Sequence, residues 1–237
     1  MSPSPVVVIS THLDDAVLSC AQTLLAFDRP IVATVFTDAP PVERHDGWNH
    51  ATTGTAFAPD SQRVRRDEDA AALELVGAEA CWLGEHEAEY RPDGQDVDAL
   101  AATLRRFLDD RAATEVWAPL GIRHVDHIAV ADAALRLVGL DGRAWRVYLD
   151  VPYAHTHPDA ATARQAHLTQ TGFVLTDHRV TPVTGSAKAS AVAAYATQVD
   201  AVRGEHPAFD ESIRLPEESW AISRSGPGAG RAPSTVA

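Results

Sequence analysis

The strongest constraint on the fold is a short apolar run near the start of the chain that ends abruptly in charged residues. Residues 6–9 read Val-Val-Val-Ile, and His12, Asp14 and Asp15 follow directly after them. Four consecutive β-branched residues indicate a strand that is buried on both faces, as in parallel sheets. Apolar residues with helical spacing follow from 15 to 27. The three polar residues are therefore expected at the carboxyl end of a strand, where open α/β sheets place their active sites.

The same alternation of strand and helix patterns continues along the chain. Apolar runs predict strands at 31–36, 80–84, 115–119, 145–151 and 214–222, with edge or antiparallel strands at 172–183. Helical spacing predicts helices at 97–108, 127–138 and 186–199, and at 61–76, where Ser61 is the expected cap. This order predicts an α/β fold with a mostly parallel sheet and helices on both faces. No domain boundary is evident, so a single domain is expected over residues 1–224, followed by a disordered Gly/Pro/Ser-rich tail at 225–237.

Composition narrows the classes of partner. The chain has 237 residues, 45% of them hydrophobic, and a formal net charge of −13, which is unsuited to nucleic acid or anionic lipid surfaces. Cys20 and Cys81 form no C-x-x-C motif and are expected to be small buried residues. No secretory signal pattern and no run of about 20 apolar residues is visible, so the expected location is the cytoplasm.

Residues 37–60 lack clear periodicity and predict a long loop, the kind of segment that often forms an active-site wall. The segment carries His45, Trp48 and His50. The alternative interpretation is that these three are ordinary surface residues of the loop.

Further polar clusters follow later predicted strands. His124, Asp126 and His127 come after the fourth strand, and the region from Tyr153 to His157 follows the fifth. Either His-containing cluster alone is compatible with a capped helix start, but two at matching strand-to-helix junctions favour a metal site.

Catalytic zinc takes three protein ligands, and two histidines with one carboxylate form a known set. From the residues alone, the candidate ligands are His12 with Asp14 or Asp15, and His124 or His127. The remaining carboxylate and histidine would flank the activated water as general base and as acid or oxyanion partner.

Taken together, these motifs resemble the LmbE/PIG-L family of zinc-dependent N-acetylglucosaminyl deacetylases. The H-P-D-D-E motif of that family corresponds to residues 12–16, and its H-x-D-H motif corresponds to residues 124–127. The resemblance also includes an R-x-x-E at Arg65 to Glu68 and a late region with Lys188 and Gln198, and it runs from about residue 6 to 220.

The resemblance implies an LmbE-like, Rossmann-like fold and an enzyme that removes an N-acetyl or related N-acyl group from an amino-sugar-containing small molecule. It implies that His12, Asp15 and His127 bind Zn²⁺, with Fe²⁺ as an alternative in cells because the ligand types alone do not select between them. It further implies that Asp14 is the general base and His124 the general acid or oxyanion partner, oriented by Asp126.

The chain departs from the family pattern at three positions. Ala16 replaces the glutamate of the first motif, and Leu13 replaces its proline. Ile122 stands where some members place a tyrosine near the oxyanion, and Tyr153 or His155 are the expected substitutes. For the R-x-x-E motif, the alternative interpretation is a structural ion pair between Arg65 and Glu68.

Five residues are expected to contact the substrate because they lie near predicted strand ends or in the long loop: Asp38, Trp48, Glu87, Tyr153 and His155. Arg65, from the R-x-x-E motif, is a sixth expected substrate contact. Two other functions remain open, a hydrolase of a different C–N bond in a natural-product pathway and a non-catalytic binding member of the same family. A nucleotide-binding module is disfavoured because no G-x-G-x-x-G follows the first strand.

Overall fold

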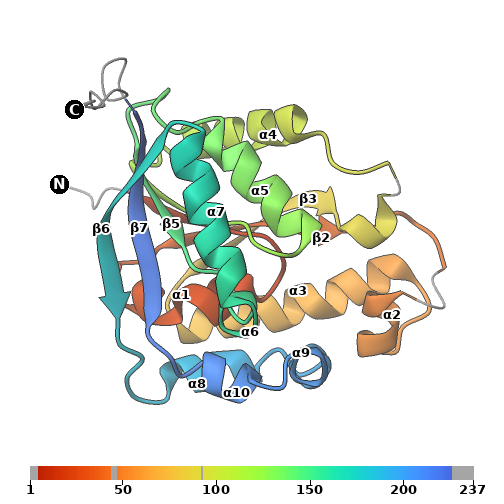
Figure 1. Cartoon of the computed structure of the whole chain (residues 1–237). Helices are drawn as coiled ribbons and strands as arrows, with labels where there is room; N and C mark the ends of the chain where they lie inside the picture. The colour runs from red at the N-terminus through yellow and green to blue at the C-terminus, as the bar shows by residue number, and fades with distance from the viewer. Residues whose placement is uncertain (1–4, 44–46, 92, 226–237) are drawn as a thin grey trace, which may run out of the picture.

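A computed structural model describes residues 5–43, 47–91 and 93–225 (Figure 1). Seven strands form one sheet in the order β3-β2-β1-β4-β5-β7-β6. The strands are β1 Val6–Ser10, β2 Ile31–Asp38, β3 Glu79–His86, β4 Glu115–Pro119, β5 Ala144–Tyr148, β6 Phe173–Thr181 and β7 Glu217–Arg224. The first five are parallel, β7 runs antiparallel to β5, and β6 runs antiparallel to β7. The predicted α/β fold with a mostly parallel sheet is therefore confirmed.

Helices connect the strands and cover both faces of the sheet (Figure 1). They are α1 Asp15–Leu25, α2 Trp48–Thr53, α3 Ala58–Leu75, α4 Val97–Asp110, α5 Val125–Leu135, α6 Tyr153–Thr156, α7 Pro158–Gln170, α8 Ala187–Ala193, α9 Val199–Glu205 and α10 Phe209–Ser212, with a 3₁₀ turn at Ala88–Tyr90. Within the described ranges, no helix is both long enough and apolar enough to cross a lipid bilayer.

The buried strands supply two hydrophobic cores, because successive side chains point to opposite faces of a sheet. Val7 and Ile9 of β1 belong to one core, which α4, α5 and α7 complete. Val8 belongs to the other, which α1, α3 and α8 complete. This explains why β1 reads as a continuous apolar run without polar alternation.

The chain order creates a crevice between β1 and β4. From β1 the chain moves outward to β2 and β3, and then returns to place β4 on the other side of β1, with Val7 opposite Val116. Ligands of open α/β sheets bind outside the carboxyl ends of the strands at such a reversal. The two histidine-containing junctions therefore meet at the reversal point of this sheet.

Several boundaries differ from the predictions. The segment 37–60 is not irregular throughout, because it contains α2, which ends at Gly54 in the left-handed conformation. Helix α3 begins at Ala58 after Phe57, with proline in its first turn, so the predicted Ser61 cap is wrong and Ser61 is a buried residue inside the helix. The predicted helix at 186–199 is divided into α8 and the start of α9, and α7 was not predicted. Apart from Ser225, the predicted tail lies outside the described residues, as does His45.

A buried ion pair joins the last strand, β7, to helix α8, and its carboxylate also binds helix α1. The ammonium of Lys188 on α8 lies 3.0 Å from the Glu217 carboxylate on β7, and both side chains are nearly inaccessible to solvent. The same carboxylate accepts hydrogen bonds from the backbone N–H groups of Gln22 and Thr23 on α1. Glu217 thus satisfies donors from two helices at once.

We expect Glu217→Ala to lower the free energy of unfolding by about 3–5 kcal/mol, because it leaves the Lys188 ammonium buried without its partner. Urea denaturation followed by circular dichroism measures this loss. Asp200→Ala removes an exposed carboxylate from Arg203 and serves as the control, with little change expected because solvent screens this pair. Equal losses in the two variants would contradict the role given to Glu217.

Candidate metal centre and substrate pocket

The two polar junctions lie side by side because β1 and β4 are parallel neighbours. After β1, His12 occupies a turn, Asp14 precedes the first residue of α1, and Asp15 opens that helix. After β4, His124 is the N-cap of α5, and His127 lies in its first turn. Short turns that lead directly into helices bring all five side chains to one edge of the sheet.

His12, Asp15 and His127 converge on one point. Asp15 Oδ2 lies 3.2 Å from His12 Nδ1 and 3.2 Å from His127 Nε2. Although His127 Nε2 is this close to a carboxylate oxygen, the geometry is not that of a hydrogen bond, and the nitrogen is fully buried. A buried nitrogen aimed at a carboxylate without a bond, beside a second imidazole, fits a shared divalent cation. The three donor atoms lie within 4.8 Å of one another.

A second grouping, His12 with His124 and Asp126, also lies within 4.8 Å. It fits a cation less well, because the Asp126 carboxylate already accepts the backbone N–H of Ala88 at 2.9 Å and pairs with Arg91. The set with Asp15 is therefore the better candidate.

Each candidate ligand histidine is held by a carboxylate on its other nitrogen. Asp126 Oδ2 lies 3.1 Å from His12 Nε2, and Asp150 Oδ1 lies 2.6 Å from His127 Nδ1. Such partners fix the ring orientation of metal-binding histidines. Asp126 was expected to orient His124, and its backbone N–H does donate to His124 Nδ1, but its carboxylate lies 4.0 Å from that ring and contacts His12 instead.

Two of these supporting residues were not predicted. Asp150 lies two residues beyond the end of β5, and its other oxygen accepts the N–H of Gly121, which ties the neighbouring strand ends together. A polar residue at the end of an apolar strand was the available sequence signal. Arg91 lies after the 3₁₀ turn and carried no such signal.

Charges around the cluster raise the pKa of both histidines. Burial lowers the pKa of His127, but the charge of Asp15 and the contacts to Asp15 and Asp150 outweigh it and raise that pKa to about 9. Burial also lowers the pKa of His12, but Asp126 and Asp15 raise it well above its ordinary value. The carboxylates at this edge of the sheet therefore favour a positive charge next to them, either on the two imidazoles or on a bound cation.

Asp14 and His124 flank the cluster. Asp14 precedes α1 without capping it, so its carboxylate stays free to face the pocket, and burial together with the Asp15 charge raises its pKa to about 6. His124 Nδ1 accepts the backbone N–H of Asp126, which leaves Nε2 to carry the hydrogen of the neutral ring. Burial and the neighbouring histidines lower the pKa of His124 to about 4, so the ring is neutral at pH 7.

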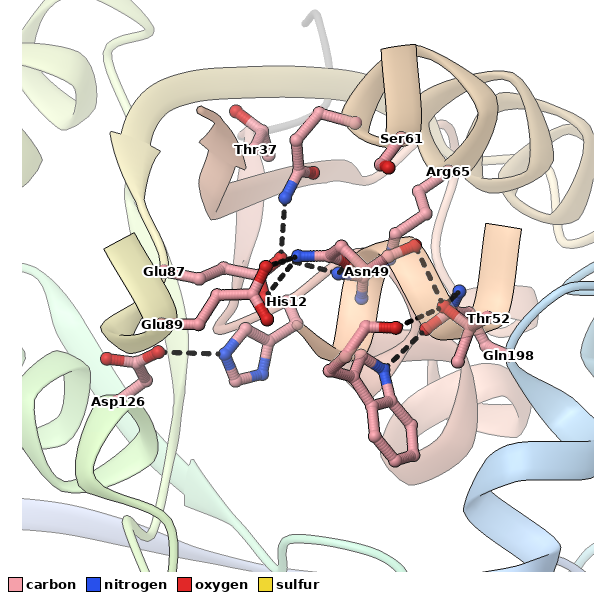
Figure 2. Close-up of polar contacts among 12 residues, drawn as sticks. His12, Thr37, Asn49, Thr52, Ser61, Arg65, Glu87, Glu89, Asp126 and Gln198 are labelled. Carbon is pink, nitrogen blue, oxygen red and sulfur yellow. Dashed lines mark hydrogen bonds and ion pairs between the residues drawn. The ribbon is translucent and has the colours of Figure 1, made fainter. Parts of the chain in front are cut away.

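A buried network around Arg65 forms the next part of the wall (Figure 2). The Arg65 guanidinium pairs with Glu87 and donates to the Asn49 side chain at 2.6 Å. Asn49 also donates to Glu89 at 2.9 Å. The alternative of an ion pair between Arg65 and Glu68 is wrong, because the Glu68 carboxylate accepts the backbone N–H and the hydroxyl of Thr197 instead, each at 2.8 Å.

These groups enclose a pocket of about 250 Å³ beside the candidate metal centre. Of the six predicted substrate contacts, Trp48, Arg65, Glu87 and Tyr153 line this pocket. Asp38 does not, because its carboxylate binds the next backbone N–H and faces Arg66. His155 does not line it either, because α6 is a single turn in which residues two apart point to nearly opposite sides.

Part of the pocket comes from α9, which no sequence motif marked. Val202 and Glu205 line the pocket from this helix, followed by His206. Gln198, noted in the sequence only as part of the late family region, lies just before α9 and also faces the pocket.

The match to a known family covers the residues that build this centre. Residues 7–138 match the family model described as PIG-L: GlcNAc-PI de-N-acetylase. The chain belongs to the PIG-L family. This match includes both histidine motifs and the Arg65 network.

Similar proteins agree with this PIG-L assignment. The 2'-N-acetylparomamine deacetylase of Niallia circulans is 28% identical over 237 residues, covering 83% of this chain and 82% of that protein. Among solved structures, the A40926 pseudoaglycone deacetylase Dbv21 has a TM-score of 0.75 and 27% identity, covering 94% of this chain and 98% of that one. The zinc-inhibited form of teicoplanin deacetylase Orf2 has a TM-score of 0.77 and 26% identity, covering 95% and 100%. The prediction of a deacetylase that acts on an amide bond is confirmed.

We expect Asp150→Asn to lower the affinity of the PIG-L centre for zinc by about 10–100-fold, because the His127 ring loses a charged partner at Nδ1. Titration of metal-free protein with zinc in the presence of a competing chelator measures this change. Asp132→Asn is the matched control, because Asp132 pairs with Arg164 away from the pocket. Unchanged affinity in Asp150→Asn would remove His127 from the ligand set.

Proposed function

We propose that this protein hydrolyses the N-acetyl, or a related N-acyl, group of an amino-sugar-containing small molecule with the help of a bound divalent cation, Zn²⁺ or, in cells, Fe²⁺. The observation that carries the proposal is the convergence of His12, Asp15 and His127 beside a pocket that Asp14 and His124 line. The similar proteins, which are named as deacetylases of 2'-N-acetylparomamine, of the A40926 pseudoaglycone and of teicoplanin, support the substrate class.

A divalent cation bound by His12, Asp15 and His127 would polarise the amide carbonyl and lower the pKa of water toward neutrality. The Asp14 carboxylate makes no capping hydrogen bond to α1, so it is available to accept a proton from the attacking water. His124 presents its Nε2 hydrogen to the carbonyl oxygen or to the departing nitrogen. Asp14 then passes that proton to the nitrogen as the carbon–nitrogen bond breaks, so that acetate and the free amine leave.

Tyr153 is the better candidate to replace the tyrosine that some family members place at position 122. Ile122 is buried in the hydrophobic core, whereas Tyr153 lines the pocket with its ring 5.0 Å from the His127 ring. Burial raises the pKa of Tyr153, so its hydroxyl stays protonated and can donate to an oxyanion. His155, the other substitute expected from the sequence, does not line the pocket.

We expect Asp14→Asn to retain about one metal ion per chain while its rate of acetate release falls at least about 100-fold, because the general base is lost. Enzymatic acetate detection and elemental analysis measure the two quantities on the same sample. Metal should be added stepwise to metal-free protein, since one solved relative is described in a zinc-inhibited form. Asp28→Asn, an exposed residue just after α1, is the control. Full activity in Asp14→Asn would remove the general-base assignment.

The charge of the pocket favours neutral or cationic substrates. Its wall carries the carboxylates of Asp14, Asp15, Glu87, Glu89, Asp126 and Glu205, against one arginine, Arg65. This excess of negative charge repels a phosphorylated sugar even with a divalent cation present.

We therefore expect N-acetylglucosamine 6-phosphate to be hydrolysed with a kcat/KM at least about tenfold below that of a neutral N-acetylglucosaminide. The difference should narrow as salt is raised, because screening weakens the repulsion. Acetate release at two ionic strengths measures both effects. A preference for the phosphorylated substrate would contradict the electrostatic argument. Absence of acetate release from every acetylated amino sugar would favour cleavage of another C–N bond or a binding role.

A further inference from the structure

One aromatic wall of the pocket is fixed in place by a buried amide. The indole Nε1–H of Trp48, on α2, donates to Gln198 Oε1 at 3.0 Å. Both residues line the pocket, yet Gln198 is only 2% exposed. A buried indole N–H needs a polar partner, and here a residue that precedes a different helix supplies it.

The amide of Gln198 is used almost completely by the protein itself. Its Nε2 donates to Thr52 Oγ1 at 3.1 Å and to Thr197 Oγ1 at 2.8 Å. Because the indole can only donate, the oxygen of the amide must face Trp48, and both amide hydrogens are taken by the threonines. Gln198 therefore has no hydrogen left for a ligand, although it borders the pocket.

The chain of hydrogen bonds continues from the Gln198 amide to helix α3. Thr197 donates its hydroxyl hydrogen to Glu68 at 2.8 Å, and Thr52 donates its own to the Trp48 carbonyl at 3.0 Å. Every hydroxyl thus donates once and accepts once, so the directions of the bonds are consistent along the whole path. The path joins the indole to α3, which packs on the sheet.

We propose that Gln198 is a positioning residue that holds the Trp48 indole as a flat wall against which the sugar ring of the substrate packs. The carboxylates of Glu87 and Glu89, which belong to the same pocket, can accept hydroxyl hydrogens. An aromatic surface combined with a few polar acceptors suits a pyranose, which has apolar C–H faces and a rim of hydroxyls. The identity of the ligand rests on the proposed function, whereas the positioning of the indole does not.

The test measures binding separately from catalysis. Isothermal titration with glucosamine, the deacetylated sugar, gives a dissociation constant for the wild type, Gln198→Leu and Trp48→Phe. We expect this constant to rise about three- to tenfold in Gln198→Leu, in which the indole loses its partner, and about threefold in Trp48→Phe, which keeps a ring but not the N–H. Trp82→Phe is the matched control, because it removes an indole bond to Asp69 outside the pocket, and its constant should not change.

Kinetics separates positioning from a general loss of structure. With a neutral N-acetylglucosaminide, Gln198→Leu should raise KM while kcat and the metal content per chain stay near wild type, as expected when only binding energy is lost. A fall in kcat and metal content with unchanged KM would overturn the proposal and assign Gln198 a purely structural role. Trp48→Phe changes a half-buried ring rather than a fully buried amide, so it remains informative if Gln198→Leu fails to fold.

The results also distinguish failure of this inference from failure of the proposed function. If the wild type binds glucosamine and releases acetate, but both variants bind as tightly as the wild type, then the sugar does not pack on Trp48 and only the positioning role is overturned. If the wild type neither binds glucosamine nor releases acetate from its N-acetyl derivatives, then the amino-sugar proposal fails, and the substrate-packing role fails with it.

Discussion

The parallel pairing of β1 with β4 is the constraint on which the rest of the centre depends. It places two strand ends, which are far apart in the sequence, at adjacent positions where the chain order reverses. Each strand then passes within a few residues into a helix, so His12 and His127 have little freedom to move apart. The supporting carboxylate of Asp150 lies just beyond the end of β5, the next strand of the sheet. The geometry of the centre is thus a property of the sheet order and not of any single loop.

Helix α3 holds the other side of the pocket through a single turn. Arg65 reaches Asn49 on α2, and Glu68 reaches Thr197 just before α9. Residues three apart on a helix lie on the same face, which usually favours a direct ion pair between them. Here the two charges instead diverge to different partners, so the R-x-x-E motif joins α2 and α9 to a helix that packs on the sheet. The spacing places both charged side chains on one face of α3, and each charge binds a different neighbouring segment.

Prediction from the sequence was most accurate where the pattern itself decides the structure. The apolar runs of β1 and β4 and the polar residues that follow them predicted that the two histidine-containing clusters meet at one edge of the sheet, because burial on both faces leaves few alternatives. Residues decided by tertiary contacts were not predictable. Nothing local distinguishes α2 from a loop, since its position depends on Asn49 and Trp48 bonding to distant elements. Likewise, the direction of His155 depends on a single helical turn at α6.

The balance of charge explains why this buried edge is suited to a cation. Asp15, Asp126 and Asp150 are carboxylates within contact of the two histidines, and among them Asp126 has a cationic partner of its own, Arg91. Buried negative charge of this kind must be compensated, because an isolated charge in the interior is costly. Protons on the two imidazoles provide that compensation, which is why the pKa of each is raised. One divalent cation supplies the same two positive charges and, unlike two protons, satisfies both imidazole nitrogens and the carboxylate oxygen from a single point.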